Sequence, residues 1–598
     1  MIEVGAVVAG LSALVTQTVT ETTQAESSSS LAKLFKKDIG AAFQQQVFKA
    51  SQQYFHNYQK RHGTLKVTCV RMDTPMELEQ LYTTVRLLNR SDLEYFESID
   101  GLSSQYRKSG RRGFQYQDKN KQDGIAVANQ EEYMMVLGGP GIGKSTLLRK
   151  VGLEAFKGQN GTFEHLCMPV FLPLQRFKSV DMTIEQRIVE ELRTCGFPEP
   201  EAVTAAMLRK GRLLVLLDGL DEVPKAQEDE VIEQIRDFVD RHGKNRFIAS
   251  CRIAAYKGGF PRFKDVTIAP FEDPQIQEFI GNWFSGERDQ SNATADQCWE
   301  LLKRPEYKAA KELAQTPLLL TLLCAVYDKQ LDFPKNRASL YGSALDVVLK
   351  EWAAEKRIHN QPIYRDLPLE LELELLSEMA FNSFVDDQLF FDKRDVTHGI
   401  KTFLIDNLNV PKHLDSEAVL EAIEVQQGIL VERARDVYSF SHLTFQEYLT
   451  AKYIVNNDQV TWLVNKHLTD ERWREVFLLV AGLMRGRQGA DTLLEVIERR
   501  STVLLKGESL KYLIAWAITA TAQSANTAKP AAKRAAVIVL TLSLARSLSR
   551  DRASAPALAR ALALHFALAL ALALDRDRAF ALALDRDRAL DLALSNIA

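Results

Sequence analysis

The sequence has few cysteines and histidines, and they are not grouped. Six cysteines are scattered over 598 residues without a Cys-x-x-Cys motif or a close pair, which is typical of reduced thiols in a cytosolic protein. No two histidines stand at His-x-x-x-His spacing, so a metal enzyme of that type is not expected.

Charge of one sign is not in excess either. The 75 Lys and Arg residues nearly balance the 78 Asp and Glu residues, which argues against a protein that coats a polyanion. A local basic group, Arg107, Lys108, Arg111 and Arg112, falls in the polar stretch 101–130. We interpret this stretch as a linker with solvated charges and expect no specific nucleic-acid contact.

Long apolar runs are missing as well, since no stretch of 18 or more residues is purely apolar. The apolar N-terminal segment 1–19 carries Glu3 and lacks a basic region, so it is a poor secretory signal. Its apolar residues follow helical spacing, and its small residues permit close helix packing. We expect an amphipathic helix packed on its own domain. A segment released to insert into a membrane or to self-associate is the alternative.

What is present indicates several domains, because 598 residues exceed one hydrophobic core. From Glu132 to about Pro270, short apolar runs of strand length alternate with helical segments, which predicts a doubly wound parallel sheet. Beyond Pro270 the pattern is helical to about Ala520. The last residues are rich in Ala and Leu and contain a tandem decapeptide with the string DRDRA, which we interpret as a low-complexity extension.

The strongest motif is G-x-x-x-x-G-K-[ST], at residues 138–145. Glycines let backbone N–H groups converge on phosphates, and the helix that follows presents its positive end to them. Lys144 would bind the β/γ-phosphates and Ser145 would offer an oxygen to Mg²⁺. The predicted nucleotide-binding residues here are Gly138, Gly139, Pro140, Gly141, Ile142, Gly143, Lys144, Ser145 and Thr146.

Acidic residues follow a second buried strand, at residues 213–217. Asp218 comes at its carboxyl end, where ligands of open α/β sheets bind, and we predict that it holds Mg²⁺. Asp221 and Glu222 would orient or deprotonate the attacking water. Capping of the next helix is the alternative role for these two residues.

A third strand, 246–252, ends in Arg252, which we predict to contact the γ-phosphate. The string Asn120–Asp123 matches the guanine-reading pattern N-K-x-D, but it lies upstream of the phosphate loop in a polar stretch. We treat that match as chance and expect adenine nucleotides.

At this point the chain resembles the NACHT group of signal-transducing P-loop ATPases, the module of NOD-like immune receptors. That group places a small residue directly after the Mg²⁺ aspartate and acidic residues just beyond, as in Asp218–Glu222. Residues 314–324 resemble its helical-domain motif, whose proline, here Pro317, lies against the adenine. Residues 438–451 resemble its winged-helix signature, whose histidine, here His442, reaches the β-phosphate of ADP in relatives.

The resemblance covers about residues 130–455 and implies a multidomain α/β and α fold. It places a P-loop NTPase domain with a doubly wound parallel sheet before helical and winged-helix domains, flanked by helical regions. We expect these divisions: 1–125, a mainly helical N-terminal domain and linker; 126–270, the nucleotide-binding domain; 271–335, the helical domain; 336–455, the winged-helix-type domain; 456–530, a C-terminal helical region; and 531–598, the Ala/Leu-rich tail.

Two departures leave the ligand sensor and the effector unassigned. We find no leucine-rich, WD or tetratricopeptide repeat after residue 460 and no nuclease, protease or TIR-like motif before residue 130.

The resemblance implies a cytoplasmic ATP/ADP switch that forms a homo-oligomer on activation. Slow hydrolysis of ATP to ADP and phosphate, with Mg²⁺, would reset it. Bacterial anti-phage defence is the implied setting, and a phage component is one candidate trigger. Two other classes stay open: a steady-turnover ATPase of mechanical or chaperone type, and a non-catalytic scaffold stabilised by nucleotide.

Overall fold

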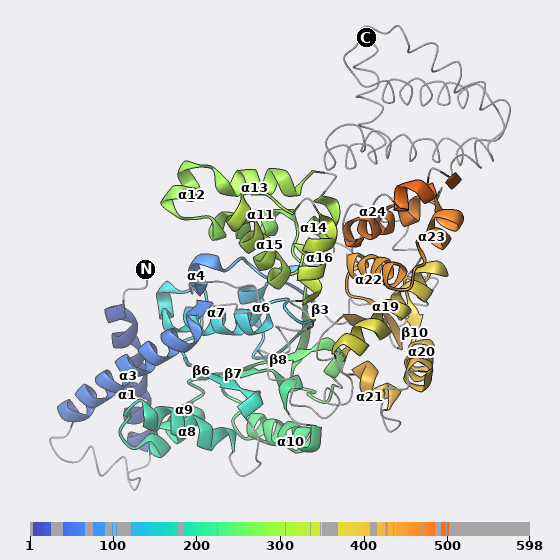
Figure 1. The fold of residues 1–598 in the computed structure, drawn as a ribbon. Helices are drawn as coiled ribbons and strands as arrows, with labels where there is room; N and C mark the ends of the chain where they lie inside the picture. Colours follow the sequence, from blue (N-terminus) through green and yellow to red (C-terminus); the bar gives the residue numbers. More distant parts are fainter. Residues whose placement is uncertain are drawn as a thin grey trace, which may run out of the picture.

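The computed structural model describes the chain in several stretches (Figure 1). They are 4–25, 40–65, 76–89, 121–176, 183–346, 369–406, 415–484 and 492–500, with short gaps at 224, 257, 305–306, 335, 422, 425–428, 435, 469 and 498. The isolated residues 99, 103 and 349 are also described. The predicted tail, 531–598, lies outside the described residues, and so does the part of the predicted C-terminal helical region that follows residue 500.

A seven-stranded sheet forms the centre of the nucleotide-binding domain, in the order β4-β3-β9-β5-β8-β7-β6. The five strands β5 to β9 are parallel, and β3 and β4 add an antiparallel edge. The bounds are β3 (Arg86–Asn89), β4 (Gln122–Asp123), β5 (Tyr133–Gly138), β6 (Met168–Pro173), β7 (Leu213–Asp218), β8 (Arg246–Arg252) and β9 (Lys264–Ile268). The doubly wound parallel sheet predicted from the sequence is therefore confirmed.

Helices cover both faces of this sheet because its central strands are apolar on both sides. Alternate residues of β5 point to opposite faces: Met134 and Val136 pack with α7, and Met135 and Leu137 pack with the N-terminal helices and α8 to α10. The bounds are α6 (Gly124–Gln130), α7 (Lys144–Phe156), α8 (Ile184–Thr194), α9 (Pro200–Lys210) and α10 (Lys225–Arg241).

The sheet begins earlier in the chain than the sequence pattern suggests. Strand β3 pairs with β9, and β4 with α6 comes from the stretch that we interpreted as linker. Asp123 accepts hydrogen bonds from the amides of Ile125 and Ala126 and so caps α6. These pieces are too short to show a period of their own, and they are fixed by pairing with a distant strand.

The N-terminal helices pack against this domain. They are α1 (Val4–Ala25) and α3 (Gly40–His62), followed by a two-stranded ribbon, β1 (Thr64–Leu65) and β2 (Met76–Glu77), and by α4 (Leu78–Leu81). The predicted apolar stripe of α1 is buried except for Val4, and it joins the apolar cluster beneath the sheet. Residues 4–22 are long and apolar enough to cross a membrane, a property that core helices of soluble proteins share.

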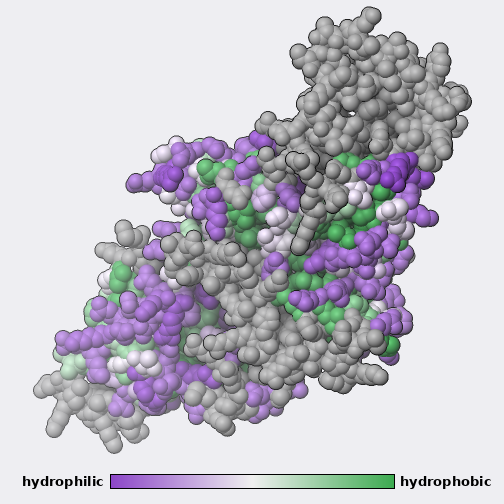
Figure 2. All heavy atoms as spheres, viewed as in Figure 1, coloured by the Kyte–Doolittle hydropathy of each residue, from purple (hydrophilic) through white to green (hydrophobic). Residues whose placement is uncertain are grey.

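The helical domain comprises α11 (Asp273–Trp283), α12 (Glu287–Ser291), α13 (Thr294–Leu302), α14 (Lys308–Leu313) and α15 (Pro317–Gln330). It adjoins the winged-helix domain (Figure 1), and one cluster of buried apolar side chains runs through both domains. On the face shown in Figure 2, hydrophobic atoms gather over α22 and α24, whereas α12 is mostly hydrophilic. The two domains therefore share apolar packing in addition to the polar contacts described below.

The winged-helix domain contains a small antiparallel sheet in the order β10-β12-β11. Its elements are α16 (Arg337–Asp346), α19 (Leu369–Val385), β10 (Phe391–Asp392), α20 (Lys393–Asp406), α21 (Ser416–Glu421), β11 (Leu430–Ala434), β12 (Val437–Phe440) and α22 (Leu443–Asn456). Two further helices, α23 (Val460–His467) and α24 (Arg474–Leu483), follow, and α24 packs on α22 and α16. The fold class expected from the sequence is thus observed in these stretches.

Candidate nucleotide site

The phosphate loop joins the end of β5 to the start of α7. Strand β5 ends at Gly138, and α7 begins at Lys144. Gly141 and Gly143 have φ angles of +69° and +103°, a backbone region that side-chain-bearing residues rarely adopt. The glycines therefore permit a loop path that points its amides toward one centre.

Lys144 reaches back over this loop. Its Nζ donates hydrogen bonds to the carbonyl oxygens of Gly138 and Gly139, at 2.9 Å and 3.0 Å. Ser145 and Thr146 follow in the first turn of α7, where the helix dipole favours an anion. The loop thus has an ammonium group, helix N-terminal amides and a hydroxyl at one end of the sheet.

Asp218 is the last residue of β7 and is held by Ser250 of the neighbouring strand β8. The Ser250 Oγ donates to Asp218 Oδ1 at 2.7 Å and accepts from the amide of Gly219 at 2.9 Å. This second bond fixes the turn in which Gly219 takes a φ of +79°. The carboxylate of Asp218 is therefore oriented at the carboxyl edge of the sheet by the protein's own hydrogen bonds.

Asp221 and Arg252 engage each other. The backbone amide of Arg252 donates to Asp221 Oδ1, and the side-chain Nε of Arg252 lies 2.9 Å from Asp221 Oδ2. Their side chains are only 4% and 6% exposed, so this is a buried ion pair. Arg252 is the register partner of Gly138 across β8 and β5, which places it beside the phosphate loop.

Glu222 folds back toward the turn after β7. A Cβ added at Gly219 would lie 3.0 Å from Glu222 Cδ, so the glycine makes room for the carboxylate. In this arrangement Asp221 is held by Arg252, and Glu222 lies next to the turn that carries Asp218. The two acidic residues that we grouped from the sequence therefore have different surroundings.

The residues present fit a nucleotide with Mg²⁺. A Cβ added at Gly139 or Gly143 would meet no atom within 4 Å, so the loop is open at these two positions. The Ser145 hydroxyl and the Asp218 carboxylate supply the oxygen ligands that Mg²⁺ prefers. These donors come from α7 and β7, which both present their ends at the same edge of the sheet.

Pro317 and Leu318, at the start of α15, bring the helical domain to the phosphate loop. The amide of Leu318 donates to the carbonyl of Gly141 at 3.2 Å. A Cβ added at Gly141 would lie 2.7 Å from Leu318 Cβ, so this contact also requires glycine. Pro317 is the first residue of α15. The helical domain therefore reaches the phosphate loop through Leu318, next to Pro317, and the contact of Pro317 with the adenine stays a prediction.

His442 lies at the N-terminus of α22 and contacts the same segment. Its Nε2 forms a 3.2 Å hydrogen bond with Thr316 Oγ1. Burial, with the nearby Arg433 guanidinium, lowers the pKa of His442 to about 4, so the ring is neutral near pH 7. The winged-helix domain is thus joined to Thr316, which lies two residues before Leu318, the residue that contacts the phosphate loop.

Several residues of this site were not found from the sequence. Ser250 holds Asp218, Leu318 touches Gly141, and Thr316 binds His442. Glu312 accepts hydrogen bonds from the first turn of α22. Ser250, a polar residue in an otherwise apolar strand two positions before Arg252, carries a weak sequence signal. Leu318, Thr316 and Glu312 make contacts between domains, and they carry no signal in the sequence.

Comparison with known families bears on this geometry. The family model "NACHT domain" matches residues 132–287, and "Winged helix-turn-helix domain C-terminal to NACHT" matches residues 337–454. The first range contains the phosphate loop, Asp218 and Arg252, and the second contains His442. The chain contains a NACHT domain.

Curated relatives carry the same module. The chain is 22% identical over 344 residues to human "NACHT, LRR and PYD domains-containing protein 10" and 22% identical over 347 residues to mouse "NACHT, LRR and PYD domains-containing protein 3". Each match covers 54% of this NACHT protein, but only 48% and 30% of the two relatives. The chain therefore carries a P-loop NTPase module of the NOD-like receptor type.

Two solved structures also match this NACHT protein. Cdc6p from Pyrobaculum aerophilum covers 62% of the chain at 11% identity with a TM-score of 0.21, and 100% of its own length is matched. RuvB from Thermotoga maritima covers 54% at 12% identity with a TM-score of 0.24, and 90% of its own length is matched. Both TM-scores are low, and it is the strand order and the motifs that identify the fold.

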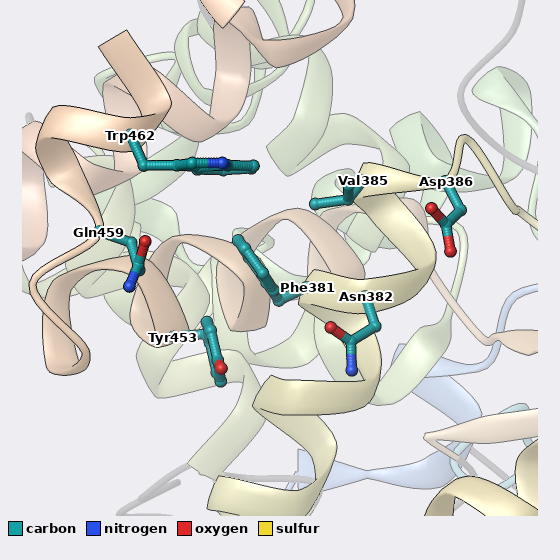
Figure 3. A pocket seen from close by; sticks show the side chains of 7 residues that line it. All are labelled: Phe381, Asn382, Val385, Asp386, Tyr453, Gln459 and Trp462. Carbon is teal, nitrogen blue, oxygen red and sulfur yellow. The ribbon is translucent and has the colours of Figure 1, made fainter. Parts of the chain in front are cut away.

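A pocket of about 330 Å³ lies away from the nucleotide site, between α19, α22 and α23 (Figure 3). Phe381, Tyr453 and Trp462 give it an aromatic wall, with Phe381 stacked on Tyr453 at 4.4 Å between ring centroids. Tyr453 stands near the C-terminal end of α22, whereas His442 stands at the N-terminal end. None of the NACHT nucleotide motifs lines this pocket.

Proposed function

We propose that this NACHT protein is an ATP/ADP-dependent signalling switch that forms a homo-oligomer on activation. The observation that carries the proposal is the segment 312–318. It contacts the phosphate loop through Leu318 and the winged-helix domain through Glu312 and Thr316. A change at the phosphates can therefore reach the winged-helix domain through seven residues.

In the closed, ADP-bound form, Lys144 binds phosphate, Pro317 lies against the base and His442 holds the winged-helix domain near the site. Bound Mg²⁺ would supply charge that screens the phosphates, with Ser145 and Asp218 as its protein ligands. Glu222 orients the attacking water and Arg252 senses the γ-phosphate. Because Arg252 is paired with Asp221 in this structure, contact with a γ-phosphate requires that pair to rearrange.

The nucleotide acts through its different affinity for two conformations. ADP favours the closed form, and ATP with a trigger favours an open form that exposes surfaces for self-association. Slow hydrolysis returns the protein to the closed form. We place the protein in the bacterial cytoplasm, in anti-phage defence, with a phage component as the candidate trigger.

The test is to identify the nucleotide that co-purifies and to measure its turnover and the assembly state together. We expect one bound ADP per chain, turnover well below the usual median near 10 s⁻¹, and larger assemblies on exchange into ATP. The control Lys144→Ala should lose nucleotide and stay soluble, because each charge-assisted hydrogen bond from the ammonium group to phosphate is worth about 1.5–3 kcal/mol.

Brisk turnover in a constant assembly would contradict the switch and favour a mechanical ATPase. Bound nucleotide that is neither hydrolysed nor exchanged would favour a scaffold. A Lys144→Ala variant that signals like the wild type would also overturn the proposal.

A further inference from the structure

The carboxylate of Glu312 lies at the N-terminus of a helix that belongs to another domain. Glu312 is the fifth residue of α14 in the helical domain, and it is only 4% exposed. The amide of Leu443 donates to its Oε1 at 3.1 Å, and the hydroxyl of Thr444 donates to its Oε2 at 3.0 Å. Both donors stand in the first turn of α22 in the winged-helix domain.

Helix α22 takes this cap from outside its own domain. Its N-cap residue is His442, which makes no capping hydrogen bond with its side chain. The first amides of a helix have no partner within the helix, and a carboxylate there also meets the positive end of the helix dipole. Glu312 therefore accepts a hydrogen bond from the first of these amides, a role comparable to that of a Ser, Asp or Asn side chain at an N-cap.

The cap also bears on His442. Leu443 and Thr444 follow His442 directly, so their bonds to Glu312 fix the backbone on which the imidazole is mounted. The ring then meets Thr316 Oγ1, four residues after Glu312. The helical domain thus holds both the backbone just after His442 and the imidazole ring of His442 itself.

We propose that Glu312 is an interdomain latch that positions His442: it caps α22 in the closed form and releases it when the winged-helix domain moves away. The inference rests on the proposed switch, because it needs two domain arrangements. Separation hydrates both the carboxylate and the helix amides, so the contact opens reversibly. Truncation of the carboxylate instead leaves the α22 donors unpartnered in a closed interface, which is costly.

Amide hydrogen exchange in the first turn of α22, measured on the full-length protein, tests the latch. The protein is compared with ADP bound and with a non-hydrolysable ATP analogue bound. In the wild type, we expect peptides covering residues 440–450 to be protected with ADP and to exchange at least tenfold faster with the analogue. Glu312→Ala should exchange fast with both nucleotides. Glu312→Gln keeps an acceptor for Leu443 and should lie between the wild type and Glu312→Ala.

Two further variants make the test specific. Thr444→Val keeps the side-chain volume and removes one donor, so it should reproduce part of the Glu312→Ala effect without a change in charge. Glu300→Ala removes an exposed carboxylate on α13 of the same domain, which pairs with Lys303 just after that helix, and should behave as the wild type. Release of a fluorescent ADP should be at least tenfold faster in Glu312→Ala and unchanged in Glu300→Ala.

Equal protection of α22 in both nucleotides in the wild type would make Glu312 a permanent cap and overturn the latch. Wild-type protection in Glu312→Ala would overturn it as well. Assembly measured on the same samples separates the latch from the proposed function. Nucleotide-dependent exchange in a protein that never assembles would support the latch and contradict the oligomerising switch.

Discussion

The N-terminal helices and the winged-helix domain are joined to their neighbours by interfaces of different chemistry. Val15 and Val19 of α1 are fully buried and belong to the apolar cluster beneath the central sheet. Where residues 312–316 meet the N-terminus of α22, the polar contacts are those of the buried Glu312 carboxylate with α22 and of the His442 imidazole with Thr316. The attachment of α1 is centred on apolar packing, and α3 adds polar contacts such as the partly exposed Arg61–Glu191 ion pair. At α22, a buried carboxylate stands beside the apolar packing.

This difference indicates where the molecule can move. Separating an apolar attachment exposes surface at about 25 cal/mol per Å² with no compensation from water. Polar partners are hydrated on separation, so parting Glu312 and His442 from their partners adds little to the cost of separating the apolar packing that these two domains also share. Under the proposed switch we expect movement between α14 and α22, and we expect α1 and α3 to move with the sheet.

The largest expected effect comes from breaking the apolar attachment. Val15→Asp should destabilise the protein by about 4 kcal/mol or more, because it loses buried apolar area and buries a carboxyl group. Val4→Asp on the same helix is the matched control, since Val4 is 46% exposed. Thermal melting compares the two. Equal melting temperatures would mean that α1 is not packed as a core helix and would favour the released, membrane-inserting segment.

The nucleotide motifs illustrate what can be predicted from sequence. An apolar run of strand length precedes the phosphate loop, Asp218 and Arg252 in turn. The local pattern therefore predicts a strand before each of them and a place for all three at one edge of the sheet. The strand order then brings Arg252 beside Gly138, which spacing alone does not reveal. The motif residues could be predicted from the sequence because their immediate neighbours in the chain build their local geometry.

The partners of these residues were not predictable for the opposite reason. Ser250 and Asp218 are 32 residues apart, and Glu312 and Thr444 are 132 apart. Such pairs carry no period and no fixed spacing, and they arise only when strands or domains are brought together. Strand β3 escaped notice in the same way, because four residues cannot display an alternation that outweighs chance.

A polar contact inside one domain sharpens the comparison, because its strength can be measured without separating the helical and winged-helix domains. Removing either partner of the Asp221–Arg252 pair, by Asp221→Ala or Arg252→Ala, should cost about 3–5 kcal/mol, since a buried charge is left without its partner. The double variant should cost little more than either single one. Denaturation followed by circular dichroism measures the cycle. Additive changes in the free energy of unfolding would show that the two side chains act independently.

The pH dependence of closure tests the polar attachment itself. Burial, with Arg433, lowers the pKa of His442 to about 4, and exposure on opening should return it toward 6.5. Between pH 6.5 and 4 the open form then binds more protons, so closure is fully stable above pH 6.5 and weakens as the pH falls. At pH 5 the closed form is destabilised by at most about 2 kcal/mol, and less to the extent that water already reaches the ring.

Release of ADP between pH 7 and pH 5 measures this effect. It should accelerate in the wild type and respond less in His442→Leu. His242 also has a lowered pKa because of burial, but it lies in the nucleotide-binding domain, so His242→Gln should keep the wild-type profile. Identical profiles for the wild type and His442→Leu would remove His442 from the closure.

The smallest expected effect concerns the hydroxyl that orients Asp218. Ser250→Ala removes a 2.7 Å hydrogen bond to a carboxylate and leaves the Gly219 amide without that acceptor, a destabilisation of about 1–2 kcal/mol. Because both partners lie within the sheet, the change should leave α22 protection untouched. It should raise the Mg²⁺ concentration needed for tight ATP binding by up to about tenfold, with ADP binding in the absence of Mg²⁺ unchanged. Titration of Mg²⁺ against bound nucleotide, with the exposed Ser343→Ala as control, measures this shift. An unchanged Mg²⁺ requirement would mean that Ser250 supports the turn after β7 and not the metal ligand.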